Sequence, residues 1–251
     1  MDEAALDALL ESLSADTAFT DQLKDFADTC IAALNTSLTP QQQGVFVLAC
    51  IHLSQKTECA RQDVNATLCL NAMTLMKCPI GIQSFVDAAA LRSCWRQQLV
   101  SVVSSLGGGS FSDESFVDEA CPVLEENARA LANCSLQAAG LASGDTVDLA
   151  AVGTAIDAST VTSDSEKALQ QAVLATCQAN SATTVDAFLD CWATEAADGC
   201  VTSGAERIAT GGRRGRGPPG GVIPFGGRGG RGGPRGRGGR GGGGRGGGGR
   251  R

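Results

Sequence analysis

The sequence predicts an all-α body, cross-linked by disulfides and followed by a disordered tail rich in glycine and arginine. Three observations predict this fold class. Apolar residues recur at helical spacing through the first 210 residues, helix-capping motifs precede several of these stretches, and 11 cysteines are dispersed among them. Strand signals are weak, so no extended sheet is expected.

The individual helices follow from this pattern. Leucines within residues 6–13 recur with the 3.6-residue period of a helix. Thr39 with Gln42 and Ser163 with Glu166 form two capping boxes, each ahead of an apolar stretch. Further helices are predicted near residues 21–34, 61–77, 82–106, 112–141, 147–158 and 184–197. Pro122 is expected to kink or restart the helix in which it lies.

The body is apolar but poor in large rings. Hydrophobic residues make up 43% of the chain and aromatic residues only 4%, and much of the apolar content is alanine. We therefore expect helices that approach one another closely through small side chains.

The body also looks duplicated, with residues 1–106 and 113–210 as two helical, cysteine-rich repeats and residues 107–112 as a Gly/Ser linker. The only two tryptophans, Trp95 and Trp192, each follow a cysteine, and a Val-Asp-Ala segment precedes both. The suggested equivalences are Cys30 with Cys121, Cys50 with Cys134, Cys78 with Cys177, and Cys94 with Cys191. Chance similarity between two alanine-rich stretches is the alternative.

Charge divides the chain at about Thr210. Residues 211–251 contain 23 Gly, 11 Arg, 4 Pro and three other residues, with no acid. All 27 acidic residues and the other nine basic ones precede this tail, so the body carries a formal charge of −18 and the tail +11. This segregation predicts two parts with different partners, or with each other as partners. The tail has too few apolar residues to fold alone.

The tail segment from Phe225 to Gly233 resembles the glycine-arginine-rich (RGG) tails of RNA-binding proteins. The resemblance implies arginines that grip phosphates and stack on bases. A solvated polycation for other anionic polymers, such as acidic proteins or sulfated glycans, is the broader alternative. The polyanion-binding candidates are Arg213, Arg214, Arg216, Arg228, Arg231, Arg235, Arg237, Arg240, Arg245, Arg250 and Arg251.

The cysteine content predicts an oxidised protein, because 11 cysteines in 210 residues exceed what a reduced core commonly holds. A reduced core remains the alternative. No CxxC spacing and a single histidine argue against zinc. Cys78 and Cys94 are not expected to pair, because Cys94 would lie roughly 18 Å into the next helix. The disulfide candidates are Cys30, Cys50, Cys59, Cys69, Cys78, Cys94, Cys121, Cys134, Cys177, Cys191 and Cys200.

Three Asn-x-Ser/Thr sequons, at Asn35, Asn65 and Asn133, are glycosylation candidates and favour secretion. The first residues show no basic start and no apolar run, so a secreted protein would need a leader that this sequence does not show. No apolar run reaches membrane-spanning length. The body loosely resembles the small, all-helical, cysteine-rich secreted proteins of invertebrates, and that resemblance carries no functional residue with it.

Catalysis and cofactors are not expected. His52, the only histidine, lies in an apolar helical stretch, and nothing marks a neighbouring cysteine as a nucleophile. We expect a secreted structural or matrix protein that uses its tail for polyanion binding or self-association. The alternatives are an intracellular RNA-associated protein in the nucleus or cytoplasm, and an extracellular carrier of a lipid or another small ligand.

Overall fold

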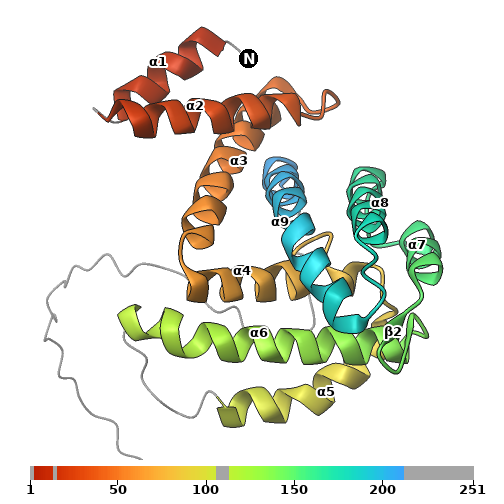
Figure 1. Cartoon of the computed structure of the whole chain (residues 1–251). Helices are drawn as coiled ribbons and strands as arrows, with labels where there is room; N and C mark the ends of the chain where they lie inside the picture. The colour runs from red at the N-terminus through yellow and green to blue at the C-terminus, as the bar shows by residue number, and fades with distance from the viewer. Residues whose placement is uncertain (1–2, 14–15, 106–112, 212–251) are drawn as a thin grey trace, which may run out of the picture. The chain divides into compact units, whose positions relative to one another are not determined.

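A computed structural model describes residues 3–13, 16–105 and 113–211 (Figure 1). The predicted linker, residues 107–112, lies outside these ranges, as does the tail beyond Gly211 with all of its arginines. The described part forms one compact unit. It is predominantly helical, as the sequence predicts.

The helices follow one another with short connections. In chain order, the elements are α1 (Glu3–Leu13), α2 (Thr17–Ala32), α3 (Pro40–Arg61), α4 (Val64–Met76), the 3₁₀ turn η1 (Ile82–Ser84), α5 (Ala88–Ser105), α6 (Asp113–Ala138), β1 (Ala142–Ser143), β2 (Thr146–Val147), α7 (Leu149–Ala158), α8 (Asp164–Ala179) and α9 (Val185–Ala209). The two strands form a small antiparallel hairpin in which Ala142 pairs with Val147.

Two hydrophobic cores share one helix. In Figure 1, α6 lies between α4 and α5, and α3 runs from α1 and α2 to α4. One core gathers side chains of α4 to α8 around the first half of α9, and the other gathers α1, α2 and α3 around its second half. Because α9 supplies both cores, the two groups of helices are held together along its length.

Trp192 of α9 is the largest side chain of the first core and is fully buried. Its ring lies 5.2 Å from Phe85 and 5.4 Å from Phe188, measured between ring centroids. Its indole N–H donates to the carbonyl oxygen of Ile80 at 3.3 Å, so the polar end of the ring is also satisfied.

Small residues let α9 approach its neighbours, as the composition predicts. A Cβ added at Gly199 would lie 2.6 Å from the Ile80 side chain, and one at Gly204 would lie 3.3 Å from Leu53. Ala193, Ala196 and Ala205 of the same helix are buried as well.

Five disulfides join the helices, and their Cα–Cα distances of 4.7–5.9 Å suit the bond. The pairs are Cys30–Cys50, Cys69–Cys121, Cys78–Cys200, Cys94–Cys134 and Cys177–Cys191. Cys78 and Cys94 have other partners, in agreement with the sequence argument. A disulfide between two consecutive helices does occur elsewhere, between Cys177 of α8 and Cys191 of α9. It can form because Cys191 lies in the second turn of α9, close to the connection between the two helices.

The predicted duplication is not reflected in the pairing. Three of the disulfides join residues 1–106 to residues 113–210, and none of the four suggested cysteine equivalences produces a repeated pair. The two repeats themselves stay a prediction.

Several predicted helix bounds were wrong. The helix predicted at residues 82–106 begins only at Ala88, because the carboxylate of Asp87 accepts hydrogen bonds from the Ala89 and Ala90 backbone N–H groups. The helix predicted to end at residue 197 continues to Ala209, where its second half enters the other core. Helix α6 continues through Pro122 without a new start.

Both capping boxes are confirmed, at Thr39 and at Ser163. The leucine stripe of α1 is buried at Leu6 and Leu10, whereas Leu9 is 47% exposed. Within the described ranges, each helix is too short or too polar to cross a membrane.

We predict that Gly81→Ala destabilises the protein by about 1–3 kcal/mol. A Cβ at Gly81 would lie 2.5 Å from the Thr74 carbonyl oxygen and 2.8 Å from that of Leu75, and backbone cannot move aside cheaply. The matched control is Gly44→Ala in α3, where a Cβ meets nothing within 4 Å and the helix should gain about 0.5–1 kcal/mol. Urea denaturation followed by circular dichroism measures both. Equal midpoints for the two variants would contradict the argument.

We predict that the disulfides differ in their contribution according to the chain they enclose. Cys78 and Cys200 are 122 residues apart, and Cys177 and Cys191 are 14 apart. Loop entropy then assigns about 4–5 kcal/mol to the first pair and about 3 kcal/mol to the second. The measurement is the thermal midpoint of each double Cys→Ser variant. If removal of Cys177–Cys191 lowers the thermal midpoint more than removal of Cys78–Cys200, native contacts and not chain entropy determine which disulfide contributes more.

Candidate functional site

The predicted polyanion-binding arginines all lie outside the described residues, so their geometry is not part of the structure. The described part of the structure is the acidic body, which the sequence predicts to be a partner of the cationic tail. Glu166 is its only buried acidic side chain, and most of the other described acidic groups are exposed. Four of the nine basic residues of the body form ion pairs there: Lys24, Arg61, Arg129 and Arg207. The surface of the body is therefore strongly acidic.

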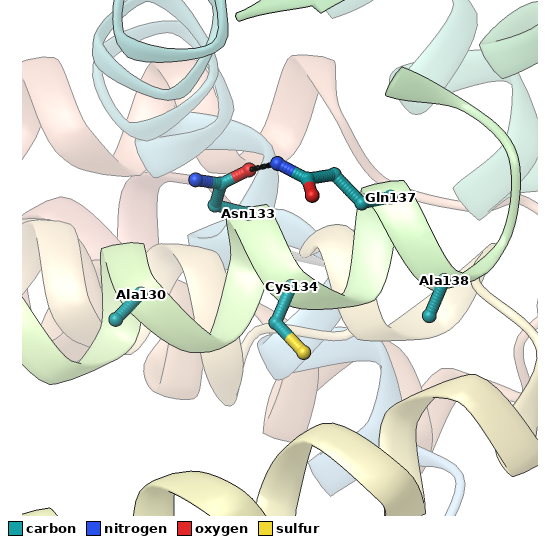
Figure 2. A pocket seen from close by; sticks show the side chains of 5 residues that line it. All are labelled: Ala130, Asn133, Cys134, Gln137 and Ala138. Atoms are coloured by element: carbon teal, nitrogen blue, oxygen red, sulfur yellow. Dashed lines mark hydrogen bonds between the residues drawn. The ribbon is translucent and has the colours of Figure 1, made fainter. Parts of the chain in front are cut away.

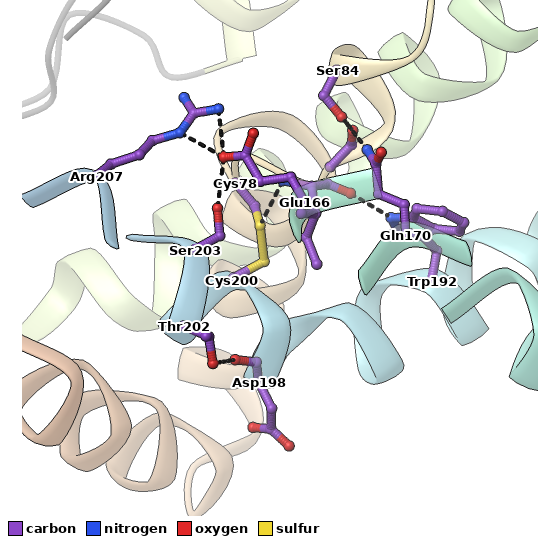
Figure 3. The surroundings of a disulfide bond; sticks show 12 residues. Cys78, Ser84, Glu166, Gln170, Trp192, Asp198, Cys200, Thr202, Ser203 and Arg207 are labelled. Carbon is purple, nitrogen blue, oxygen red and sulfur yellow. Dashed lines mark hydrogen bonds and ion pairs between the residues drawn. A yellow bond between two sulfur atoms is a disulfide. The ribbon is translucent and has the colours of Figure 1, made fainter. Parts of the chain in front are cut away.

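Glu166 forms a buried polar cluster beside the Cys78–Cys200 disulfide (Figure 3). Glu166 is 5% exposed and is the third residue of α8, in its first turn. One oxygen accepts from the Ser163 backbone N–H at 2.8 Å, and the other accepts from the Ser203 hydroxyl and from Arg207 at 2.8 Å each. The cluster ties the start of α8 to the second half of α9.

The electrostatics of this cluster are those of a satisfied ion pair. Burial by itself raises the pKa of Glu166, but the hydrogen bonds from Arg207, Ser163 and Ser203, together with the charge of Arg207, lower it below its ordinary value. A carboxylate that stays ionised and holds its donors in fixed positions is suited to a structural role.

A second buried polar contact lies nearby. The side-chain amide of Gln170, on α8, donates to the Ser84 hydroxyl at 2.5 Å, and the Ser159 hydroxyl donates to the Ser84 carbonyl oxygen at 2.8 Å. These bonds join η1 to α8 and to the end of α7.

Of the 11 disulfide candidates, ten are paired in the structure and one is not. All 11 cysteines lie in the described ranges, and ten of them form the five disulfides. Cys59, also a disulfide candidate by sequence, is free and exposed on α3. An odd number of cysteines requires one to be left over, but only the structure identifies it.

The three sequons lie in different local structures. Asn35 lies in the loop after α2, where its side-chain oxygen accepts from both the backbone N–H and the hydroxyl of Ser37, at 3.0 and 2.8 Å. Asn65 lies in the first turn of α4 and donates to Asp118 at 2.9 Å. All three asparagines are half-buried, and the Asn35 amide nitrogen donates to Glu206 at 2.9 Å, so Asn35 differs from the other two in lying in a loop and not in a helix.

Asn133 lies near the C-terminal end of α6 at a shallow hollow (Figure 2). Gln137, one turn later, donates to its side-chain oxygen at 2.8 Å. Cys134 is disulfide-bonded, and the hydroxyl-bearing residue of the sequon, Ser135, is fully buried. In the folded protein this sequon therefore lies within a helix, and its hydroxyl-bearing residue is in the hydrophobic core.

A second hollow, of 550 Å³, lies between η1, the start of α5 and the segment after α7. Its lining is mainly apolar and includes Phe85, Leu91, Leu141 and Val161. Asp87 contributes a carboxylate to the rim, but both of its oxygens already cap α5.

The described part of the structure shows no cluster of side chains that would suit a metal site, and the single histidine stands apart. His52 is exposed on α3, and in this part of the chain no three His, Cys, Asp or Glu side chains converge as metal ligands would. The chain matches no protein-family model, no curated protein and no solved structure.

Sequence reasoning missed the Glu166 cluster. The capping box indicated the bond between Ser163 and Glu166, but Ser203 and Arg207 lie about 40 residues later and carry no spacing signal. Only the packing of α8 against α9 brings them to the same carboxylate.

We predict that Glu166→Gln costs about 1–3 kcal/mol at pH 7, because Arg207 and Ser203 lose a charged acceptor. Since the pKa of Glu166 is lowered in the folded state, its ionisation stabilises the protein above the unfolded pKa of about 4.3, and this stabilisation is lost as pH falls through the folded pKa. The difference in unfolding free energy between the wild type and Glu166→Gln should therefore shrink as the pH falls from 7 to 3. Denaturant titrations at pH 7, 5 and 3 measure it.

The matched control is Asp198→Asn. Asp198 pairs with Arg61 at 2.8 Å, but its side chain is 76% exposed, so the change should be small at each pH. A Glu166→Gln deficit that stays constant from pH 7 to pH 3 would overturn the assignment of an ionised carboxylate.

Proposed function

We propose that this is a secreted, non-enzymatic structural or matrix protein in which a cationic Gly-Arg arm extends from an acidic, disulfide-linked body. The arm binds anionic polymers, and the acidic bodies of neighbouring copies are among them. The observation that carries the proposal is the separation of charge, −18 on the body and +11 on the arm.

The described structure supports this proposal in two ways. Most of the acidic groups that the structure describes are exposed and so are accessible to a polycation, and among them only Glu166 is buried. Five disulfides favour an oxidising compartment, since such bonds form and persist outside the reducing cytosol.

The alternative, an intracellular RNA-associated protein, takes its support from the arginine-rich segment after Phe225. The two proposals differ in the thiol content of the native protein. No more than one reactive thiol per chain fits the oxidised, secreted protein, whereas close to 11 fits the reduced, intracellular one.

We predict that the full-length protein forms dense, turbid assemblies at low salt and that a version ending at Thr210 does not. Attraction between exposed charges is screened over about 8 Å at physiological ionic strength and about 3 Å at 1 M salt. Turbidity should therefore fall as salt rises. Light scattering against salt and protein concentration is the measurement.

Two matched variants separate charge from arginine chemistry. Replacing the 11 tail arginines with lysine keeps the charge and should keep most of the assembly, whereas replacing them with glutamine should abolish it. The same pair tests binding to heparin and to RNA of scrambled sequence, which should weaken steeply with salt. If the version ending at Thr210 assembles as readily as the full chain, the arm is not the cross-linker.

A further inference from the structure

The outward face of α3 has features of an interface. One side of this helix packs into the body and buries Phe46, Val47, Cys50 and Ile51. Figure 1 shows α3 between α2 and α4, with α9 along one flank, and these are the helices against which it packs. The opposite side exposes large apolar groups: Val45 is 40% and Leu48 54% exposed.

Five residues of this face follow a heptad repeat, four of them exposed and the fifth, Gln55, half-buried. Val45, His52 and Cys59 are seven residues apart, and Leu48 and Gln55 form a second series displaced by three. Val45, Leu48, His52 and Cys59 are all exposed. Such spacing is that of the a and d positions of a coiled coil, and a β-branched residue at a with leucine at d favours two parallel strands.

Charge indicates which occupant suits this face. Residues 29–57 contain no Asp or Glu, whereas the body as a whole has 27 in 210 residues. Two bodies of charge −18 repel one another over most of their surfaces, and an acid-free face is where this repulsion is weakest. Glu58, at its border, is next to Arg61 of the same helix at 3.8 Å. Electrostatic repulsion against a second copy of the chain is therefore weakest at this face.

Cys59 lies on the same seam and is the one cysteine outside the five disulfides. On two helices packed in register, each seam residue faces its own copy. With axes 8–10 Å apart and Cα atoms about 2.3 Å from each axis, facing Cα atoms come within the roughly 7 Å that a disulfide needs.

We propose that two copies of this protein pair through the outward face of α3, parallel and in register, and that a Cys59–Cys59 disulfide links them. The seam is short and includes His52 and Gln55, so its non-covalent affinity is low and the covalent bond secures the pair. Two thiols lose two protons and two electrons, which reduce one low-molecular-weight disulfide to two thiols. This pairing is independent of the tail and of the function proposed above.

The test uses the full-length protein in 1 M NaCl, which screens attraction between tail and body. Oxidised glutathione is the oxidant, and the readouts are non-reducing gels, light scattering and peptide mapping. We expect a covalent dimer with a Cys59–Cys59 peptide, which Cys59→Ser abolishes. A product that carries only glutathione on Cys59, with no dimer, overturns the proposal.

Moving the cysteine tests the register. In the Cys59→Ser background, His52→Cys lies one heptad earlier on the same seam and should restore the dimer. Val64→Cys is the matched control, since Val64 is 81% exposed but lies off this face, and it should not cross-link. Equal cross-linking by the two variants would indicate random collision and overturn the proposal. Cross-linking between Cys59 and a cysteine at position 45 would overturn the parallel register.

A substitution on the seam tests the packing without touching the thiol. Leu48→Asp removes the apolar contact at the centre of the seam and forces two carboxylates out of water, a cost that salt does not screen, and should slow dimer formation about tenfold. Met73→Asp, at a residue of α4 that is 45% exposed, is the matched control and should leave the rate unchanged. Circular dichroism confirms that each variant is folded. An equal rate for Leu48→Asp and the wild type would show that α3 does not form the interface.

Discussion

The structure depends on one long helix that serves two cores. The first half of α9 carries Trp192, whose ring packs against Phe85 and Phe188 and whose N–H is satisfied by Ile80. The second half carries Val201 and Ala205 into the core of α1 to α3. If α9 ended where its sequence pattern weakens, the first three helices would lose the surface against which they pack.

Close approach and covalent linkage coincide on this helix. Cys200 is bonded to Cys78, and the adjacent Gly199 leaves room for Ile80, which itself receives the Trp192 hydrogen bond. One and two turns further, respectively, Ser203 and Arg207 hold the buried carboxylate of Glu166. Apolar packing, a disulfide and the ion pair between buried Glu166 and half-exposed Arg207 thus act on the same short stretch, and each holds α9 in the position that the others require.

The surface has two regions of different character. The exposed surface of the body carries a large excess of acidic over basic groups, which suits contact with a polycation such as the Gly-Arg arm. The outward face of α3 is instead apolar and free of acids. We propose that these features give the protein two separate ways to associate, one sensitive to salt and one dependent on a thiol, and each can be altered without the other.

The sequence by itself determined the helical class and both capping boxes and favoured an oxidised body over a reduced one, because these depend on local spacing and composition. Capping at Thr39 and Ser163 needs only residues three positions apart. It also indicated small side chains at helix contacts, although not which helices would meet.

The tertiary structure decided the pairing of the cysteines, the full length of α9 and the identity of Cys59 as the free thiol. It also decided that Glu166 meets Ser203 and Arg207. Each of these depends on residues distant in the chain, and Cys78 lies 122 positions from Cys200. Local patterns carry no record of which helix faces will pack, because that choice follows from the fit of whole cores, and those contacts form only when the chain has folded.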